Sequence, residues 1–522
     1  MLIGTESTVF AAGIAGNATI PGAQLTASST DALLPAIQAG GVVAHIGPSL
    51  AASVTADEIG DALTPGSSRG AHGSLGIIKP DVAAPGTLIF SAASGTGTAA
   101  QTLSGTSMSA PHVAGIAALV RATQPGWTPA QVKAAVMNTA THDVWTGANQ
   151  SGTAYGPQRV GSGRVDARAA VADTVLAYGS EDPDQVSVTF GVVDVADEPV
   201  TLKKTVTVQN TGTEAVTYGT AFAASTTTGA ATITTSPASL TVPAGQQGLV
   251  TLTLTADPAT LEREIDPTQA TTQGGVPREY VASLSGRLVL TSGSDELRVP
   301  VQAAPRLVSE LTADPVSFAD AGAQTAALTL SGRGVDSGGW TSLVAPLTLG
   351  ATSPKLEDVP GFVTSESAVA SGDLRWVGWT STAPQQAAAG GDPADGYLGV
   401  GIAVDGDWAT LGQAVLPVVD WDVDGDGATD AQTVVQKLSE AADVTVAATF
   451  DYESGETLDV QAVNGAFGDV DTTVFDSSVL VAPVGIAALG LEPGATPTAT
   501  VWTFSDYAAD PGGQVDAADA FT

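Results

Sequence analysis

Residues 103–115 read LSGTSMSAPHVAG and decide how the first third of the chain is interpreted. Apolar residues recur after this stretch at spacings of three and four, which predicts a helix with one apolar face: Val113, Ile116, Ala117 and Val120. Ser107 is therefore expected at or just before a helix N-terminus, where unpaired backbone N–H groups and the positive end of the helix dipole gather. Fixed N–H donors of this kind stabilise the oxyanion that a serine nucleophile creates. Ser107 is the candidate catalytic nucleophile, and the alternative is a serine that only caps a buried helix.

This stretch resembles the nucleophile segment of the subtilisin-like serine peptidases, the subtilases. Residues 67–70 (SSRG) and 79–86 (KPDVAAPG) resemble two further segments of that family, in the order the family has them. The G-x-S-x-G elbow of α/β-hydrolases is excluded, because Ser109 stands where its second glycine would be. The resemblance implies a serine endopeptidase that acts on proteins or peptides and forms an acyl-enzyme on Ser107. It implies no cofactor for the chemistry.

The other triad members are not found at the positions that the family requires. A subtilase triad runs Asp, His, Ser along the chain, and only His45 and His72 precede Ser107. Neither opens a His-Gly-Thr segment, so both are interpreted as structural, while His112 matches a family helix residue rather than the base. Asn17 lies in an Ala-Gly-Asn resembling the oxyanion segment, but the residues after it do not continue that pattern. We expect the Asp and His on upstream sequence and this chain alone to be inactive.

The composition limits the classes of partner and compartment. The chain has 522 residues, no cysteine and a formal net charge of −36. This charge argues against nucleic acid or an anionic membrane as a partner, and the missing cysteines exclude disulfides and thiolate chemistry. No apolar run is long enough to span a membrane, and the N-terminus lacks the basic region of a signal peptide. We expect a secreted protein whose export signal lies outside this sequence.

The predicted architecture is multidomain. Residues 1–60 resemble the closing portion of a protease-associated domain, and residues 61–176 resemble the C-terminal part of an α/β subtilase catalytic domain, a parallel sheet with helices. Alternating apolar and polar residues then predict a β-sandwich over 183–305, which resembles the fibronectin type III-like domain of large subtilases. Residues 306–522 are expected to form a further β-rich domain. In this class the β-domains contribute packing and stability, with cell-surface contacts as a further prediction.

An acidic loop in the last domain carries the alternating carboxylates of a calcium-binding turn. Its candidate ligands are Asp422, Asp424, Asp426 and Asp430. Thr433 occupies the position at which an EF-hand has a bidentate glutamate. The alternatives are a structural calcium site and an acidic β-turn without an ion. Six of the eight tryptophans also follow residue 306 and are interpreted mainly as core.

Two functions from different classes remain open. In the first, the chain is the nucleophile-bearing portion of a secreted subtilase. In the second, it is an inactive remnant whose β-domains bind a glycan or protein at the cell surface.

Overall fold

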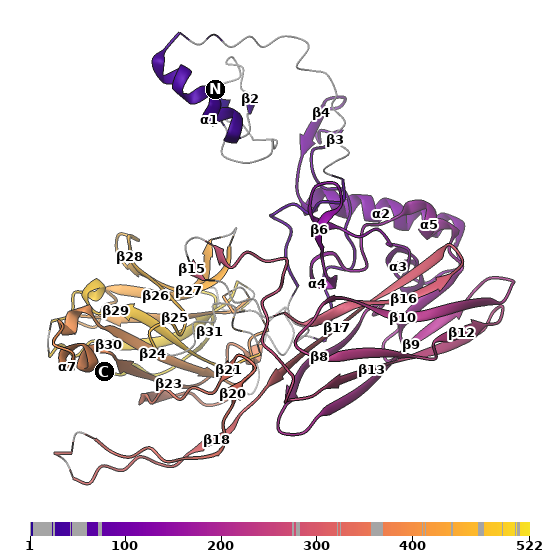
Figure 1. Ribbon diagram of the computed structural model, residues 1–522. Coiled ribbons are helices and arrows are strands. Elements are labelled where there is room, and N and C mark those ends of the chain that lie inside the picture. The colour runs from indigo at the N-terminus through magenta and orange to yellow at the C-terminus, as the bar shows by residue number, and fades with distance from the viewer. Residues whose placement is uncertain are drawn as a thin grey trace.

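The computed structural model describes residues 2–3, 23–24, 27–41, 43, 60–70, 76–273, 276–277, 282–320, 322–323, 325–356, 369–409, 411–412, 414–439, 442–467, 474, 476–492, 494–506, 508 and 512–522. Figure 1 shows a helical region around α2 beside two strand-rich bodies. Within the described ranges, no helix is long and apolar enough to cross a bilayer.

Among its described residues, the N-terminal segment contains the helix α1 (Ala27–Ala39) and a parallel pair of two-residue strands, β1 (Leu2–Ile3) and β2 (Ala23–Gln24). The sequence predicts a helix over 31–39, and this helix is present but begins four residues earlier. Asn17, His45 and His72 lie outside the described residues, as does most of the strand expected over 41–46.

Four helices lie within residues 106–172, and three of them, α2, α3 and α5, pack against one another. The helix α3 starts with a complete capping box, in which the Thr128 side chain accepts from Gln131 N–H and the Gln131 side chain accepts from Thr128 N–H. Pro129 takes the first helical position, as the sequence predicts. Val132, Ala135 and Val136 bury the inner face of α3 against Ile116 and Val120 of α2. The elements are α2 (Thr106–Thr123), α3 (Pro129–Asn138), α4 (Pro157–Val160) and α5 (Ala167–Ala172), with β3 (Ile89–Ala92), β4 (Ala100–Leu103), β5 (Trp145–Gly147) and β6 (Ser151–Ala154).

The parallel sheet predicted for residues 61–176 is not formed among the described residues of that region. Its strands pair antiparallel, β3 with β4 and β5 with β6. Parallel pairing there is confined to the isolated bridges Ala62–Trp145 and Ala83–Arg164. The physical reason is the connection length, because short loops join neighbouring strands antiparallel whereas a parallel pair needs a crossover of a dozen or more residues.

Residues 175–307 form two sheets around one hydrophobic core. One sheet has the order β12-β10-β16-β17-β8 and the other β11-β13-β9-β7. Val250, Leu252 and Leu254 are fully buried between them, as their alternation predicts. The strands are β7 (Val175–Gly179), β8 (Val188–Val195), β9 (Val200–Asn210), β10 (Val216–Thr226), β11 (Thr232–Ser236), β12 (Ser239–Val242), β13 (Gln247–Ala256), β16 (Leu284–Ser292) and β17 (Asp295–Leu307), with β14 (Thr272–Gln273) and β15 (Val276–Pro277) outside the two sheets.

The C-terminal part contains a second pair of sheets around its own core. Their orders are β22-β23-β24-β29 and β28-β27-β26-β25-β30-β31. Trp408 and Trp421 lie inside this core, whereas Trp376 is 55% exposed, so the core interpretation holds for some tryptophans only. The elements of the two sheets are β22 (Thr348–Thr352), β23 (Leu374–Ser381), β24 (Tyr397–Val404), β25 (Leu416–Asp422), β26 (Ala431–Ser439), β27 (Ala442–Asp451), β28 (Thr457–Ala462), β29 (Val479–Gly485), β30 (Thr498–Phe504) and β31 (Gln514–Ala517). Shorter elements are β18 (Glu310–Ala313), β19 (Leu330–Arg333), β20 (Asp336–Ser337), β21 (Trp340–Thr341), α7 (Ala383–Ala388), η3 (Pro393–Asp395) and η4 (Ala487–Leu489).

Candidate active site

Ser107 lies in the first turn of α2, as the sequence predicts. The helix begins at Thr106, and its N-cap residue Gly105 has a φ of 150°, a backbone conformation that favours glycine. The N-cap has no side-chain hydrogen bond, and Ser107 itself is exposed. The Ser107 hydroxyl therefore lies at the positive end of an 18-residue helix, where backbone N–H groups lack intrahelical partners.

The segment 79–86 holds this turn from one side. Gly105 N–H donates to the Gly86 carbonyl at 2.8 Å, and the Ser109 hydroxyl donates to the Ala84 carbonyl at 2.9 Å. A Cβ at Gly86 would clash with Ser109 Oγ and lie 2.8 Å from the Gly105 carbonyl oxygen. Only glycine allows this approach. The segments 79–86 and 103–115, each noted for its resemblance to the same family, are therefore in direct contact.

The segment 79–86 is fixed in turn to residues 161–165. Ala83 N–H donates to the Gly163 carbonyl, and Val165 N–H donates to the Ala83 carbonyl, both at 2.9 Å. Gly161 has a φ of 57°, and a Cβ there would collide with the Asp81 carbonyl. The backbone around Ser107 is thus braced by a second layer of backbone hydrogen bonds.

The segment 67–70 joins the same layer through α4. Gly70 N–H donates to the Gln158 carbonyl at 2.7 Å, and Arg159 Nη1 donates to the Ser67 carbonyl at 2.8 Å. Three segments recognised separately in the sequence therefore belong to one connected framework.

A buried polar network joins this framework to the first sandwich, and no motif in the sequence predicted it. Arg69 forms an ion pair with Asp266, whose side chain is fully buried. Gln158 Nε2 also donates to Asp266 Oδ2 at 3.2 Å. Burial raises the pKa of Asp266, but the Arg69 charge and the hydrogen bonds from Thr268 outweigh this and hold the pKa below its usual range.

Arg287 forms the second half of this interface. Its guanidinium, buried in β16, donates to the Gly161 carbonyl at 3.0 Å and to the Tyr155 carbonyl at 3.2 Å. Burial lowers the pKa of Arg287 to about 10, with Arg298 adding to the effect. An arginine inside a strand next to apolar residues is a signal that could have pointed to such an interface.

The two histidines within the described residues do not act on Ser107. His112 Nδ1 lies 2.8 Å from the Met108 carbonyl, in keeping with its assignment as a helix residue. His142 Nε2 lies 3.4 Å from Asp166 Oδ2. Neither contact places an imidazole against the Ser107 hydroxyl.

A hollow of about 410 Å³ lies beside the start of α2. The β3–β4 hairpin forms one wall, where Phe90 is 75% exposed, and α2 forms the other through Met108, Pro111 and His112. The wall is mixed in polarity, with apolar side chains next to Ser91 and Gln101.

The acidic loop connects β25 and β26. Carboxylate oxygens of Asp422, Asp424 and Asp426 lie within 4.8 Å of one another, close enough for one cation. Asp430 is not part of this group, and its Oδ2 accepts from Val423 N–H at 2.7 Å. Asp422 also accepts from Gly425 and Gly427 N–H, as an acidic turn without an ion would.

The exposed Ser107 at the start of α2 lies beside backbone N–H groups, the kind of fixed donor that stabilises an oxyanion. Residues 9–163 match the model of the subtilase family, Peptidase_S8. The chain is 38% identical over 136 residues to the subtilisin-like protease SBT4.13 of Arabidopsis thaliana, covering 24% of this chain and 18% of that protein. It is 51% identical over 73 residues to SBT2.6 of the same plant, covering 12% and 9%. These matches support membership in a family of serine-type peptidases.

The likeness is confined to part of each molecule. The chain spans 18% and 9% of the lengths of these two relatives. Among solved structures, the secreted serine protease VesC from Vibrio cholerae aligns with 63% of this chain and 48% of its own, at 9% identity and a TM-score of 0.16. That score is too low to indicate a shared fold.

Proposed function

We propose that this chain is the nucleophile-bearing part of a secreted subtilase-type serine endopeptidase, with Ser107 as its nucleophile. The observation that carries the proposal is the exposed Ser107 in the first turn of α2, in a turn fixed by Gly86 and Ala84. The Ser107 oxygen attacks the carbonyl carbon of a peptide bond, the hydroxyl proton passes to a base, and the amine leaves. The Ser107 N–H donates to the oxyanion, and water then hydrolyses the acyl-enzyme.

The base is proposed to come from outside this chain. The histidines that the structure describes make other contacts, His112 with Met108 and His142 with Asp166. The matched relatives are several times longer than the aligned segments, which is consistent with an Asp and a His supplied by upstream sequence. Proteins or peptides are the proposed substrates, and no cofactor is proposed for the chemistry.

The flanking domains are proposed to have supporting roles. Residues 1–60 are proposed as the end of a protease-associated insert, and residues 183–305 as a fibronectin type III-like domain. The buried contacts of Arg69 and Arg287 favour a stabilising role for this second domain. A binding role for the β-domains of an inactive chain is the alternative.

The experiment compares this chain with a longer polypeptide that carries upstream sequence with an Asp and a His-Gly-Thr segment. We expect the 522-residue chain to be essentially inactive on casein and the longer one to be active. Loss of a catalytic-triad member lowers kcat by a factor of about 10⁴–10⁶, a range that comes from triad variants of subtilisin. Ser107→Ala in the longer chain abolishes turnover, while the free energy of unfolding changes by at most about 1 kcal/mol. Retained activity in that variant, or Ser107-dependent turnover by the short chain, contradicts the proposal.

We also propose that the β25–β26 loop holds a structural calcium ion through Asp422, Asp424 and Asp426. Their mutual approach within 4.8 Å favours the site. Three carboxylates this close repel one another, and a divalent cation removes that repulsion.

A further inference from the structure

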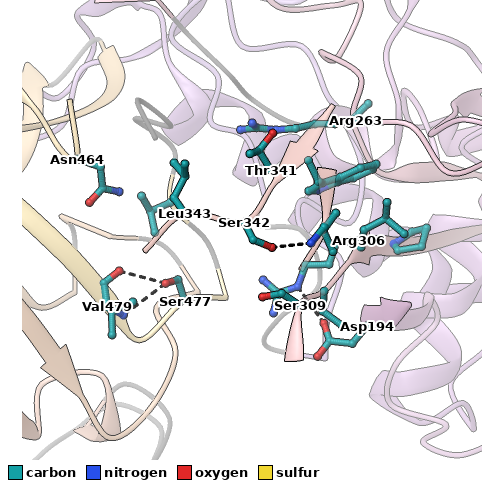
Figure 2. Close-up of a pocket in the computed structure, with 18 residues that line it drawn as sticks. Asp194, Arg263, Arg306, Ser309, Thr341, Ser342, Leu343, Asn464, Ser477 and Val479 are labelled. Atoms are coloured by element: carbon teal, nitrogen blue, oxygen red, sulfur yellow. Dashed lines mark hydrogen bonds and ion pairs between the residues drawn. The ribbon is translucent and has the colours of Figure 1, made fainter. Parts of the chain in front are cut away.

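A polar crevice of about 580 Å³ lies between the first sandwich and the C-terminal sheets. Figure 2 shows Asn464, Ser477 and Val479 on one side, and Arg263 and Arg306 on the other. The segment that contains Ser342 and Leu343 lies between these two groups. We propose that this crevice binds a neutral oligosaccharide, a role that is independent of Ser107.

Arg306, one of the two arginines that line the crevice, is already paired with two carboxylates, which favours a neutral ligand there. Arg306 Nε donates to Asp194 Oδ1 at 2.9 Å, and its Nη2 lies 3.2 Å from Asp476 Oδ2. Arg263 contributes a second positive charge to the lining. Charges of both signs are thus present, and Asp407 adds a further negative charge near Asp476. An anion would have to displace the carboxylates from Arg306, and a cation would meet Arg263.

One wall offers an aromatic surface next to exposed apolar groups. Trp340 packs partly against the core of the first sandwich and also lines the crevice. An indole face carries negative charge density, which attracts the polarised C–H bonds on the flat face of a pyranose ring. Leu343 and Val479, both more than half exposed, extend the apolar surface. A sugar ring has one face of this character together with a polar rim.

The polar groups suit a ligand that both donates and accepts hydrogen bonds. Asn464 Oδ1 accepts from Val481 N–H at 2.8 Å, which fixes the orientation of the amide and leaves its two N–H donors for a ligand. Ser342 Oγ accepts from Val335 N–H at 2.8 Å and keeps its own O–H to donate. Hydroxyl groups of a saccharide can serve both kinds of partner. The volume lies within the range of about 300–1,000 Å³ usual for small-molecule sites.

The test uses the full 522-residue chain and four neutral disaccharides: maltose, cellobiose, lactose and N,N′-diacetylchitobiose. Binding is measured by titration calorimetry and by tryptophan emission. We expect at least one disaccharide to bind. Asn464→Asp keeps an oxygen for Val481 N–H and tolerates the positive φ of this residue, but removes both amide donors. It should weaken binding about tenfold or more.

The matched control is Asn149→Asp. Asn149 also has a positive φ, is exposed in the β5–β6 turn and lies outside the crevice, so the same change in charge should leave binding unaltered. Thr341→Val is a second variant that removes an exposed hydroxyl from the lining without touching either core, and it should also weaken binding.

Three results overturn the proposal. They are no detectable binding of any of the four disaccharides, equal binding by Asn464→Asp, and binding only of a neutral capped peptide, which would assign the crevice to a protein partner. Whether the chain hydrolyses casein has no bearing on disaccharide binding. This proposal and the proposal for Ser107 can therefore fail separately.

Discussion

Replacing Asp266 with Asn tests whether the segment around Ser107 and the first sandwich form one unit. Asp266 Oδ2 accepts from Gln158 at 3.2 Å and pairs with Arg69, while Oδ1 accepts from Thr268 N–H at 2.8 Å and from Thr268 Oγ1 at 2.6 Å. An asparagine keeps one oxygen for Thr268 but turns an N–H₂ group toward the donors of Arg69 and Gln158. The Arg69 side chain is only 9% exposed, so in this variant its charge loses the paired carboxylate of Asp266 at a site with little access to water.

Removal of one partner from a buried ion pair costs about 3–5 kcal/mol. With a urea m-value of about 2–3 kcal/mol/M, this lowers the unfolding midpoint by about 1–2.5 M. The measurement is urea unfolding followed by tryptophan emission, with Trp127 and Trp145 reporting on the helical region. Glu181→Gln is the control, because its pair with Lys204 is exposed and contributes about 0–1 kcal/mol.

The pH dependence gives a second readout for the same pair. The pKa of Asp266 is depressed in the folded protein, so its ionised form contributes stability above the unfolded pKa. That contribution is lost as the pH falls through the folded pKa, and the difference between the native chain and Asp266→Asn should shrink there. The double variant Arg69→Met/Asp266→Leu should be more stable than Asp266→Asn alone. A shift for Asp266→Asn no larger than that for Glu181→Gln would refute the reasoning.

Three further outcomes are expected. Gly86→Ala should cost about 1–3 kcal/mol and speed amide exchange at Gly105, because its Cβ would clash with Ser109 Oγ, whereas Gly115→Ala on the open side of α2 should not destabilise. Burial raises the pKa of Asp173 to about 7, so the native chain should lose stability as the pH rises from about 4 to 7, by at most about 4 kcal/mol, and Asp173→Asn should abolish this slope in pH-dependent urea unfolding. Calcium at a hundredfold excess over Kd should stabilise the C-terminal part by about 2.7 kcal/mol in thermal unfolding, and magnesium should give a smaller stabilisation. Asp424→Ala should remove the calcium effect, and equal responses to both ions would leave the loop as a turn without an ion.

Local features of the fold could be predicted because short stretches of sequence determine them. The capping box at Thr128 and Gln131 needs only four residues, and the structure contains it in full. The hairpin around Gly293 is also present, with Ser292 paired to Asp295. Leu202 was expected on the inner face but is 38% exposed, although it pairs with the buried Leu254. Alternation predicts which side chains of a strand share a face. It does not predict the point along the strand at which the second sheet no longer covers that face.

The position of Ser107 at a helix start was predictable, whereas the contacts that surround it were not. Ser107 and the helix that follows it are encoded in one continuous stretch. The partner residues Asp266 and Arg287 are more than a hundred residues away, and alternation alone would place Arg287 on a solvent-facing side of β16. The structure buries that side too, because it packs against α4 and the Tyr155–Gly161 backbone. A contact between separate elements leaves no local periodic signal.

Both faces of β16 are buried over residues 284–288, which bears on what the sandwich does for the segment around Ser107. Arg287 donates to the Gly161 carbonyl, and the Gly161 backbone packs against Asp81. The segment that runs on from Asp81 to Gly86 accepts a hydrogen bond from Gly105 N–H in the turn before α2. A continuous series of hydrogen bonds is not by itself a demonstration of coupling, because coupling requires that a change at one end alters the equilibrium at the other. Gly86→Ala acts directly on the turn, whereas Asp266→Asn acts only through the interface. Faster exchange at Gly105 in both variants would therefore make the sandwich part of the machinery that positions Ser107, and faster exchange in Gly86→Ala alone would confine its role to stability.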